Sequence, residues 1–200
     1  MDLLKTRFTE LMVEANSFAS RDFAHWLFCP AMLFNSPDKW WGDHGRRDFP
    51  HEGLDFCLYE GRSGQILRLD KNTRIPVIQD GVVRAMFADY LGRALIVEHV
   101  DAHDGNRRWL SVYAHTKPLE GIEPGLFVKK GTVIATIADT GQSKAGIFSH
   151  LHVSLGLPSD RLSYDRFVWN RMRDPDLVVL LDPLPIIAGH YKVLENCSEV

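Results

Sequence analysis

Between residues 51 and 155 the chain alternates short apolar segments with clusters of turn-forming residues. The segments are rich in β-branched and aromatic residues, which fit the pleated, half-buried surface of a sheet. Turn residues interrupt them at Asp104-Gly105-Asn106, Glu123-Pro124-Gly125 and Asp139-Thr140-Gly141. The strands expected from this pattern cover residues 53–59, 80–87, 93–100, 109–115, 132–138 and 151–155. Such spacing predicts a mainly β fold, an antiparallel β-sandwich or half-barrel.

The two ends of the chain depart from this β pattern. Apolar residues repeat at helical spacing over about residues 2–18, which predicts a helix. Residues 23–41 are rich in aromatic side chains and contain two prolines, which predicts an irregular segment. Because aromatic rings bury large apolar areas, this segment should dock on the sheets or over a cleft. The expected parts are an N-terminal helix and aromatic segment at 1–46, a main domain at 47–188 and a loosely held tail at 189–200.

Composition excludes several classes of protein. Hydrophobic residues make up 45% of the chain and charged residues 24%, which predicts one domain with a sizeable core. A formal net charge of −3 gives no reason to expect nucleic acid or an anionic membrane as a partner. No apolar stretch approaches the roughly 18 residues of a transmembrane helix, and no secretory signal is apparent, which favours a cytoplasmic location. The three cysteines stand at unrelated spacings and predict neither a disulfide framework nor a cysteine zinc site.

Five residues in three short segments carry the candidate chemistry: His51, Asp55, His115, His150 and His152. On a strand, side chains i, i+2 and i+4 project from the same face. His51 can therefore point the same way as Asp55, and His150 the same way as His152. Two imidazoles and a carboxylate are a suitable donor set for Zn²⁺ with one position open for water. Two further histidines then remain for acid–base chemistry.

This arrangement resembles the M23 family of zinc metallopeptidases, the lysostaphin and LytM-like endopeptidases. The pattern of that family is His-x-x-x-Asp, then a Tyr-x-His strand, then His-x-His, and the chain contains all three in this order. The resemblance runs from about Arg47 to Leu155. Further similar segments are Gly81-Val82-Val83, Leu95-Ile96-Val97-Glu98-His99, the stretch 124–135 and Thr140-Gly141.

The resemblance implies a role for each of the five residues. His51, Asp55 and His152 would bind Zn²⁺, and His115 and His150 would be catalytic, in an order of acid and base that the sequence leaves open. The implied reaction is hydrolysis of a peptide amide bond by metal-activated water. The implied substrate is a peptidoglycan cross-bridge or stem peptide, with an intracellular peptide as the other possibility. Members of the family are usually exported, which conflicts with the absence of an apparent signal. The oligomeric state is not indicated.

Two other functions are compatible with parts of the sequence. A LytM-type module that binds or activates a partner without hydrolysis has the same fold, but such modules usually lose ligands, and this chain keeps all of them. Val128-Lys129-Lys130-Gly131 also occurs in lipoyl and biotinyl carrier domains, but the flanking context of those domains is absent. Some relatives are held latent by an N-terminal segment over the cleft. In that case Asn35 or Asp38 could reach the zinc in place of water.

The remaining histidines and one cysteine have simpler interpretations. His99 and His103 are four residues apart, like a helical zinc pair, but their neighbours indicate a strand that enters a hairpin. We therefore expect both to be structural. Cys57 should share a face with Asp55 and be a small buried residue beside the site. His25, His44 and His190 are expected to be structural or solvated, with His44 the best candidate for an exception.

Overall fold

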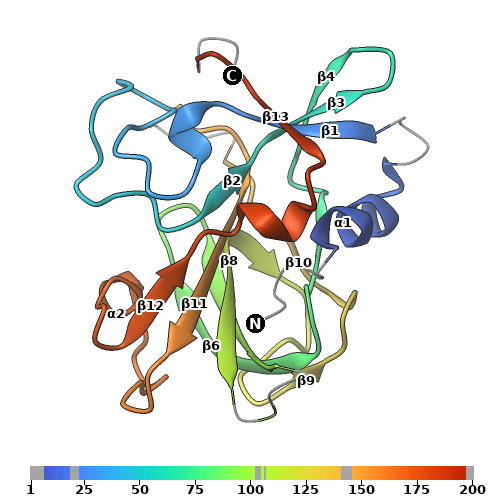
Figure 1. Ribbon diagram of the computed structural model, residues 1–200. Coiled ribbons are helices and arrows are strands. Elements are labelled where there is room, and N and C mark those ends of the chain that lie inside the picture. Colours follow the sequence, from blue (N-terminus) through green and yellow to red (C-terminus); the bar gives the residue numbers. More distant parts are fainter. Residues whose placement is uncertain (1–6, 19–22, 102–104, 106, 141–145, 197–200) are drawn as a thin grey trace.

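The computed structural model describes residues 7–18, 23–101, 105, 107–140 and 146–196 of the 200-residue chain (Figure 1). In chain order the elements are α1 (Phe8–Asn16), β1 (Phe23–Phe28), η3 (Pro30–Met32), β2 (Leu54–Phe56), β3 (Leu58–Gly61), β4 (Ile66–Arg68), β5 (Arg74–Pro76), β6 (Gly81–Ala88), β7 (Arg93–Val100), β8 (Arg108–Pro118), β9 (Phe127–Val128), β10 (Val133–Ile137), β11 (Leu151–Pro158), α2 (Trp169–Met172), β12 (Val178–Leu181), η4 (Leu184–Ile187) and β13 (Tyr191–Val193). The expectation of a mainly β fold with an N-terminal helix is confirmed.

The strands form two sheets, which occupy the upper and lower halves of the molecule in Figure 1. The smaller sheet has the order β13-β1-β3-β4, and the larger one has the order β12-β11-β8-β7-β6-β9. Strand β2 pairs with β11, and β10 pairs with β5 and β8. Residues 53–59, expected as one strand, are broken at Cys57. This break allows β2 to join the larger sheet and β3 to join the smaller one.

Side chains of β8 alternate between two apolar clusters, as the pleat of a strand requires. Trp109 and Tyr113 belong to the larger cluster, which also contains side chains of α1 and of the smaller sheet. Leu110, Val112 and Ala114 belong to a second cluster, with Phe167, Met172 and Val178. The larger sheet therefore has a buried core on each face, and the two faces are distinguishable residue by residue.

The aromatic segment differs from the irregular structure expected for residues 23–41. Residues 23–28 form β1, which pairs antiparallel with β3 and parallel with β13. Strand β13 lies within the part expected as a loose tail. Pairing with β13 satisfies backbone groups along an edge of β1 that would otherwise be open. The aromatic side chains complete the core, since Trp26 and Phe28 are fully buried.

Cys29 and Cys57 differ in their bonding. Cys29 is disulfide-bonded, so the expectation that the cysteines form no disulfide is wrong for this residue. Cys57 is a free and buried thiol. Among the residues described, no helix has the length and apolar character needed to cross a membrane.

Candidate metal centre and catalytic cleft

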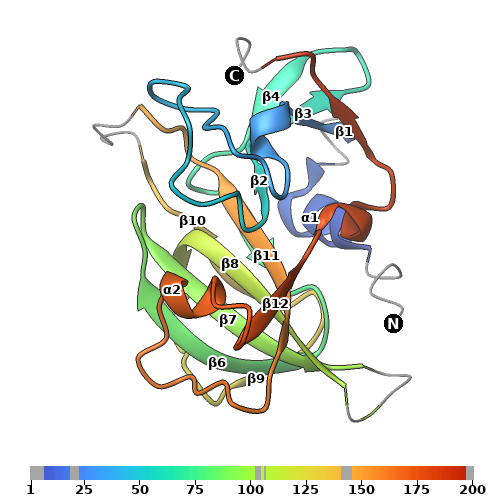
Figure 2. The same ribbon diagram turned by 60° about the vertical axis from the view of Figure 1, so that its left-hand side comes forward.

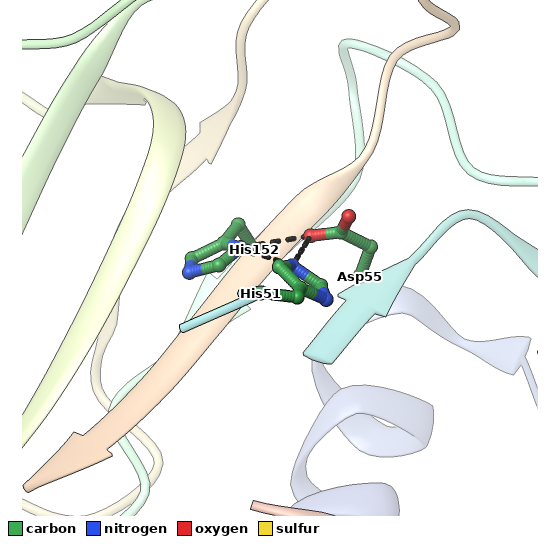
Figure 3. Close-up of side chains that lie close together, drawn as sticks. All are labelled: His51, Asp55 and His152. Atoms are coloured by element: carbon green, nitrogen blue, oxygen red, sulfur yellow. Dashed lines mark hydrogen bonds and ion pairs between the residues drawn. The ribbon is translucent and has the colours of Figure 1, made fainter. Parts of the chain in front are cut away.

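Three ligand atoms from two distant parts of the chain converge on one point (Figure 3). Asp55 Oδ1 lies 3.0 Å from His51 Nε2 and 2.8 Å from His152 Nδ1. The two imidazole nitrogens are 3.1 Å apart. Asp55 and His152 stand directly opposite each other on β2 and β11, so both side chains project from the same face. The register of this one strand pair thus brings two of the three residues together.

His51 reaches the site by another route than the strand alternation expected from the sequence. It precedes β2 and is not part of a strand. Its backbone N–H donates to Ser36 O over 3.0 Å, and its carbonyl accepts from Asn35 N over 2.8 Å. The segment then passes close over β11 at Gly53, where a Cβ atom would overlap the carbonyl oxygen of Val153. Only glycine allows this approach.

The other polar atoms of the three residues are bound to neighbours outside the triad. His51 Nδ1 donates to the carbonyl of Leu33 over 3.0 Å, which leaves Nε2 with its lone pair. Asp55 Oδ2 accepts from the indole N–H of Trp40 over 2.8 Å, so that Oδ1 is the oxygen that faces the two imidazoles. Partners of this kind fix the tautomer and orientation of metal ligands.

The geometry and chemistry of this donor set fit Zn²⁺. Ligand atoms roughly 2.0–2.1 Å from a tetrahedral zinc ion lie about 3.3 Å from one another. The three observed separations, 2.8 to 3.1 Å, are close to this value. His51, Asp55 and His152 are all buried. Burial by itself raises the pKa of Asp55, but the neighbouring His51 and a hydrogen bond with His152 hold it well below its usual range. The carboxylate is therefore available as an anionic ligand.

His150 and His115 lie beside this triad. His150 Nδ1 donates to the carbonyl of Phe148 over 2.8 Å, and its Nε2 is 3.9 Å from Asp55 Oδ1. Burial lowers the pKa of His150 to about 3, so its imidazole is neutral. The ring centroid of His115 is 4.7 Å from that of His150 and 5.9 Å from that of His152. All five residues singled out from the sequence therefore lie together.

One residue of the site, Asp89, was not among the candidates identified from the sequence. Asp89 follows β6, and its Oδ2 accepts from the backbone N–H of His115 over 2.7 Å. Burial raises the pKa of this carboxyl, but hydrogen bonding and charge from His115 outweigh the effect and lower the pKa to about 2. An aspartate before Tyr90-Leu91-Gly92 is expected from turn chemistry alone. The only signal that could have identified it is the pairing of β7 with β8, which brings this turn to His115.

The residues expected to be structural lie apart from the cleft. His99 is fully buried and bonds to Asp80 O and Ser111 Oγ over 2.9 and 2.7 Å. Burial lowers the pKa of His99 to about 4. His103 lies outside the described residues. Cys57 is also buried, which raises the pKa of its thiol to about 12.

These sequence and structural features have parallels in known proteins. Residues 60–162 match the sequence model of peptidase family M23. The chain belongs to this family. The matched region of the M23 chain contains His115, His150 and His152, whereas His51 and Asp55 precede it. No match was found among curated proteins.

Solved structures include several with partial similarity to this M23 chain. Helicobacter pylori Csd3 shares 21% identity at a TM-score of 0.42, over 86% of this chain and 36% of that one. Lysostaphin shares 18% identity at a TM-score of 0.44, over 87% and 57% of the two chains. A zinc-containing peptidase from Vibrio cholerae shares 18% identity at a TM-score of 0.42, over 85% and 41%. The M23 chain thus spans about a third to three-fifths of the length of these proteins.

The five residues of the M23 chain line a cleft of about 380 Å³. One wall comes from the segment between η3 and β2, including Lys39, Trp41, Arg47 and Phe49. The other wall comes from the β6–β7 turn and the region of α2. In Figure 2, α2 and the loops between η3 and β2 both lie on the left-hand side of the molecule. Neither Asn35 nor Asp38, the residues considered as zinc-blocking ligands, lines the cleft. The carboxylate of Asp38 instead pairs with Arg46 at 3.2 Å.

Proposed function

We propose that this chain is a zinc-dependent endopeptidase. The observation that carries the proposal is the convergence of His51 Nε2, Asp55 Oδ1 and His152 Nδ1, with two further histidines in the same cleft. Membership of an M23 peptidase family supports a hydrolytic reaction. The alternative is a LytM-type module that binds or activates a partner. The complete donor set favours hydrolysis, because a module that only binds has no need of it.

The three ligand residues would hold one Zn²⁺ and leave a fourth position open. When bound, Zn²⁺ would lower the pKa of a bound water towards about 7 and polarise a peptide carbonyl. His115 and His150 flank the site and would move the protons. One imidazole takes a proton from the attacking water, and the other delivers a proton to the leaving amine. A protonated imidazole beside the carbonyl would also stabilise the developing oxyanion.

The proposed substrate is a peptide of peptidoglycan, in a cross-bridge or a stem. The cleft is open and contains aromatic side chains on both walls, with Trp41 and Phe49 on one side and Tyr90 and Trp169 on the other. Such walls can hold an extended peptide by apolar contact.

The test combines metal analysis with turnover of purified muropeptides. We expect about one equivalent of zinc per chain, and cleavage products that mass spectrometry assigns to one peptide bond. Removal of the metal with a chelator should abolish cleavage, and Zn²⁺ should restore it. Zinc binding without cleavage of any muropeptide or peptide would favour the binding module instead. Cleavage that survives complete loss of metal would refute the zinc mechanism.

A further inference from the structure

Strand alternation by itself would turn His115 away from the metal centre. Ala114 stands opposite His152 in the register of β8 and β11, so these two side chains share a face. Ala114 lies in the second apolar cluster, whereas Tyr113 lies in the larger cluster on the other face. In a regular strand His115 would follow Tyr113 and point to that other face. The observed ring of His115 is instead 4.7 Å from the ring of His150.

A β-bulge in β8 accounts for this reversal. Arg93 pairs with Thr116 and Leu95 pairs with Tyr113, so Ala94 alone stands opposite Ala114 and His115. The extra residue, His115, has a φ of 61°, in the left-handed region. Bulges of this kind re-aim side chains, but a left-handed residue other than glycine costs conformational energy. Some neighbour must therefore hold the backbone of His115 in this conformation.

Asp89 holds the backbone of His115 in this conformation, and its two carboxylate oxygens have separate partners. Oδ1 accepts from the backbone N–H groups of Leu91 and Gly92 over 2.9 and 2.6 Å, which closes the β6–β7 turn. Oδ2 accepts from the backbone N–H of His115 over 2.7 Å and lies 3.3 Å from its Nδ1. The side chain of Asp89 is fully buried. The turn thus uses one oxygen, and the bulge uses the other.

The ring of His115 depends on the same carboxylate. Its Nδ1 is buried and has no hydrogen-bond partner of good geometry within the described ranges of the chain. Asp89 Oδ2 is the acceptor within ion-pair distance of this nitrogen. Since His115 also lines the cleft, Nε2 is the ring nitrogen left for the substrate side.

We propose that Asp89 is a positioning residue for His115. Its carboxylate holds the left-handed bulge by the backbone N–H and orients the ring through Nδ1, which leaves Nε2 for the cleft. This role rests on the proposed peptidase function for its catalytic consequence, but not for its structural one. In the reaction Asp89 would act through His115, and no hydrogen bond or ion pair joins it to His51, Asp55 or His152 in the described part of the chain.

The variant Asp89→Asn separates the two tasks of the carboxylate. Its amide oxygen can still cap the turn, while its NH₂ group faces the N–H of His115, donor against donor. We expect kcat to fall by roughly 10- to 100-fold, the scale for a lost orienting partner, with KM and zinc content little changed. Asp182→Asn is the matched control, because Asp182 caps Leu184 N over 2.9 Å in a similar turn away from the cleft. It should leave kcat unchanged.

A double-mutant cycle tests whether Asp89 acts through His115. In a His115→Ala background, Asp89→Asn should cause no further loss of rate. A further loss equal to that in the wild-type background would overturn the proposal. If Asp89→Asn fails to fold, Asp89→Ser, which keeps a short cap for the turn, replaces it. Failure of both to fold, with a folded Asp182→Asn, would make Asp89 a structural residue only and refute the proposal.

A measurement without substrate distinguishes this proposal from the proposed function. The ring ¹⁵N resonances of His115 in the zinc-loaded protein report its tautomer and environment. Asp89→Asn should shift them and leave those of His99 in place. A shift in a protein that cleaves no peptide would refute the peptidase function and support the positioning role. Unchanged His115 resonances in an active enzyme would support the peptidase function and refute the positioning role of Asp89.

Discussion

The indole nitrogen of Trp40 donates a hydrogen bond to Asp55 Oδ2 over 2.8 Å, both groups being buried. The carbonyl of Leu33 accepts a similar bond from His51 Nδ1 over 3.0 Å. Both partners come from the segment between β1 and β2, which also forms one wall of the cleft. This segment therefore orients two of the three candidate ligands. The aromatic side chains of this segment therefore pack in the core, and one of them also binds a candidate ligand.

Replacement of Trp40 by phenylalanine should weaken zinc binding. The ring and its packing are kept, but Asp55 Oδ2 loses its hydrogen-bond donor. The carboxylate is then held on that side only by Arg47, whose Nη2 lies 3.5 Å from Oδ2. We expect a loss of about 10- to 100-fold in zinc affinity, as for other partners of metal ligands. Competition with a chelator of known affinity measures this. Trp109→Phe, on the opposite face of the larger sheet and stacked on His99, should leave the affinity unchanged.

Removal of residues 1–42 should abolish the site rather than activate it. The sequence alone allowed a latent enzyme, in which this segment covers the cleft and its removal raises activity. The structure favours the opposite result, because the segment supplies the Leu33 and Trp40 partners and the buried Trp26. We expect an unfolded product or a folded one without zinc, as judged by circular dichroism and metal analysis. A folded truncation with higher activity would restore the latency idea.

Substitution of Asp55 by alanine should remove the metal. It deletes the only carboxylate of the donor set and leaves two imidazoles, so about one equivalent of zinc should be lost by mass spectrometry. Asp182→Asn provides a control for a carboxylate outside the site. Full zinc content in Asp55→Ala would show that the ligand assignment is wrong.

His115→Ala and His150→Ala should separate catalysis from binding. Neither residue belongs to the triad of converging ligand atoms, so each variant should keep its zinc. Each should lose at least about 10²-fold in rate, the usual scale for a lost acid–base group. Metal content and single-turnover rates measure the two effects separately. Loss of zinc in both variants would contradict this division of roles.

Asp89 should make the free energy of unfolding depend on pH in the acid range. Its pKa is lowered from 3.8 to about 2 in the folded chain, so the ionised form stabilises the fold above about pH 4. That contribution should be lost as the pH falls through the folded pKa towards about 2. Urea unfolding of the metal-free protein should show that the stability advantage of wild type over Asp89→Asn is smaller at pH 3 than at pH 6 by about 1 kcal/mol. A constant difference would contradict the ionised state of Asp89.

The parts that could be predicted from sequence are those that depend on local pattern. Alternation and turn residues predicted β6, β7, β8 and β11 to within a few residues. They could do so because successive side chains of a strand point to opposite faces, so that the pattern repeats every two residues. The five candidate residues were also identifiable, because imidazole and carboxylate chemistry is a property of residue type. The local pattern misjudged β1 and β13, whose pairing joins the two ends of the chain.

What the sequence determined by itself is therefore the fold class and the set of groups from which a metal site could be built. Tertiary structure decided how those groups meet. His51 and Asp55 lie 101 and 97 residues from His152, and only the β2–β11 register and the close passage at Gly53 bring them together. The bulge that turns His115 towards the cleft, and the contacts made by Asp89 and Trp40, arise from pairing between distant strands and loops. The physical reason is that a side chain's type is encoded at one position, whereas the face it points to and the partner it meets depend on long-range register.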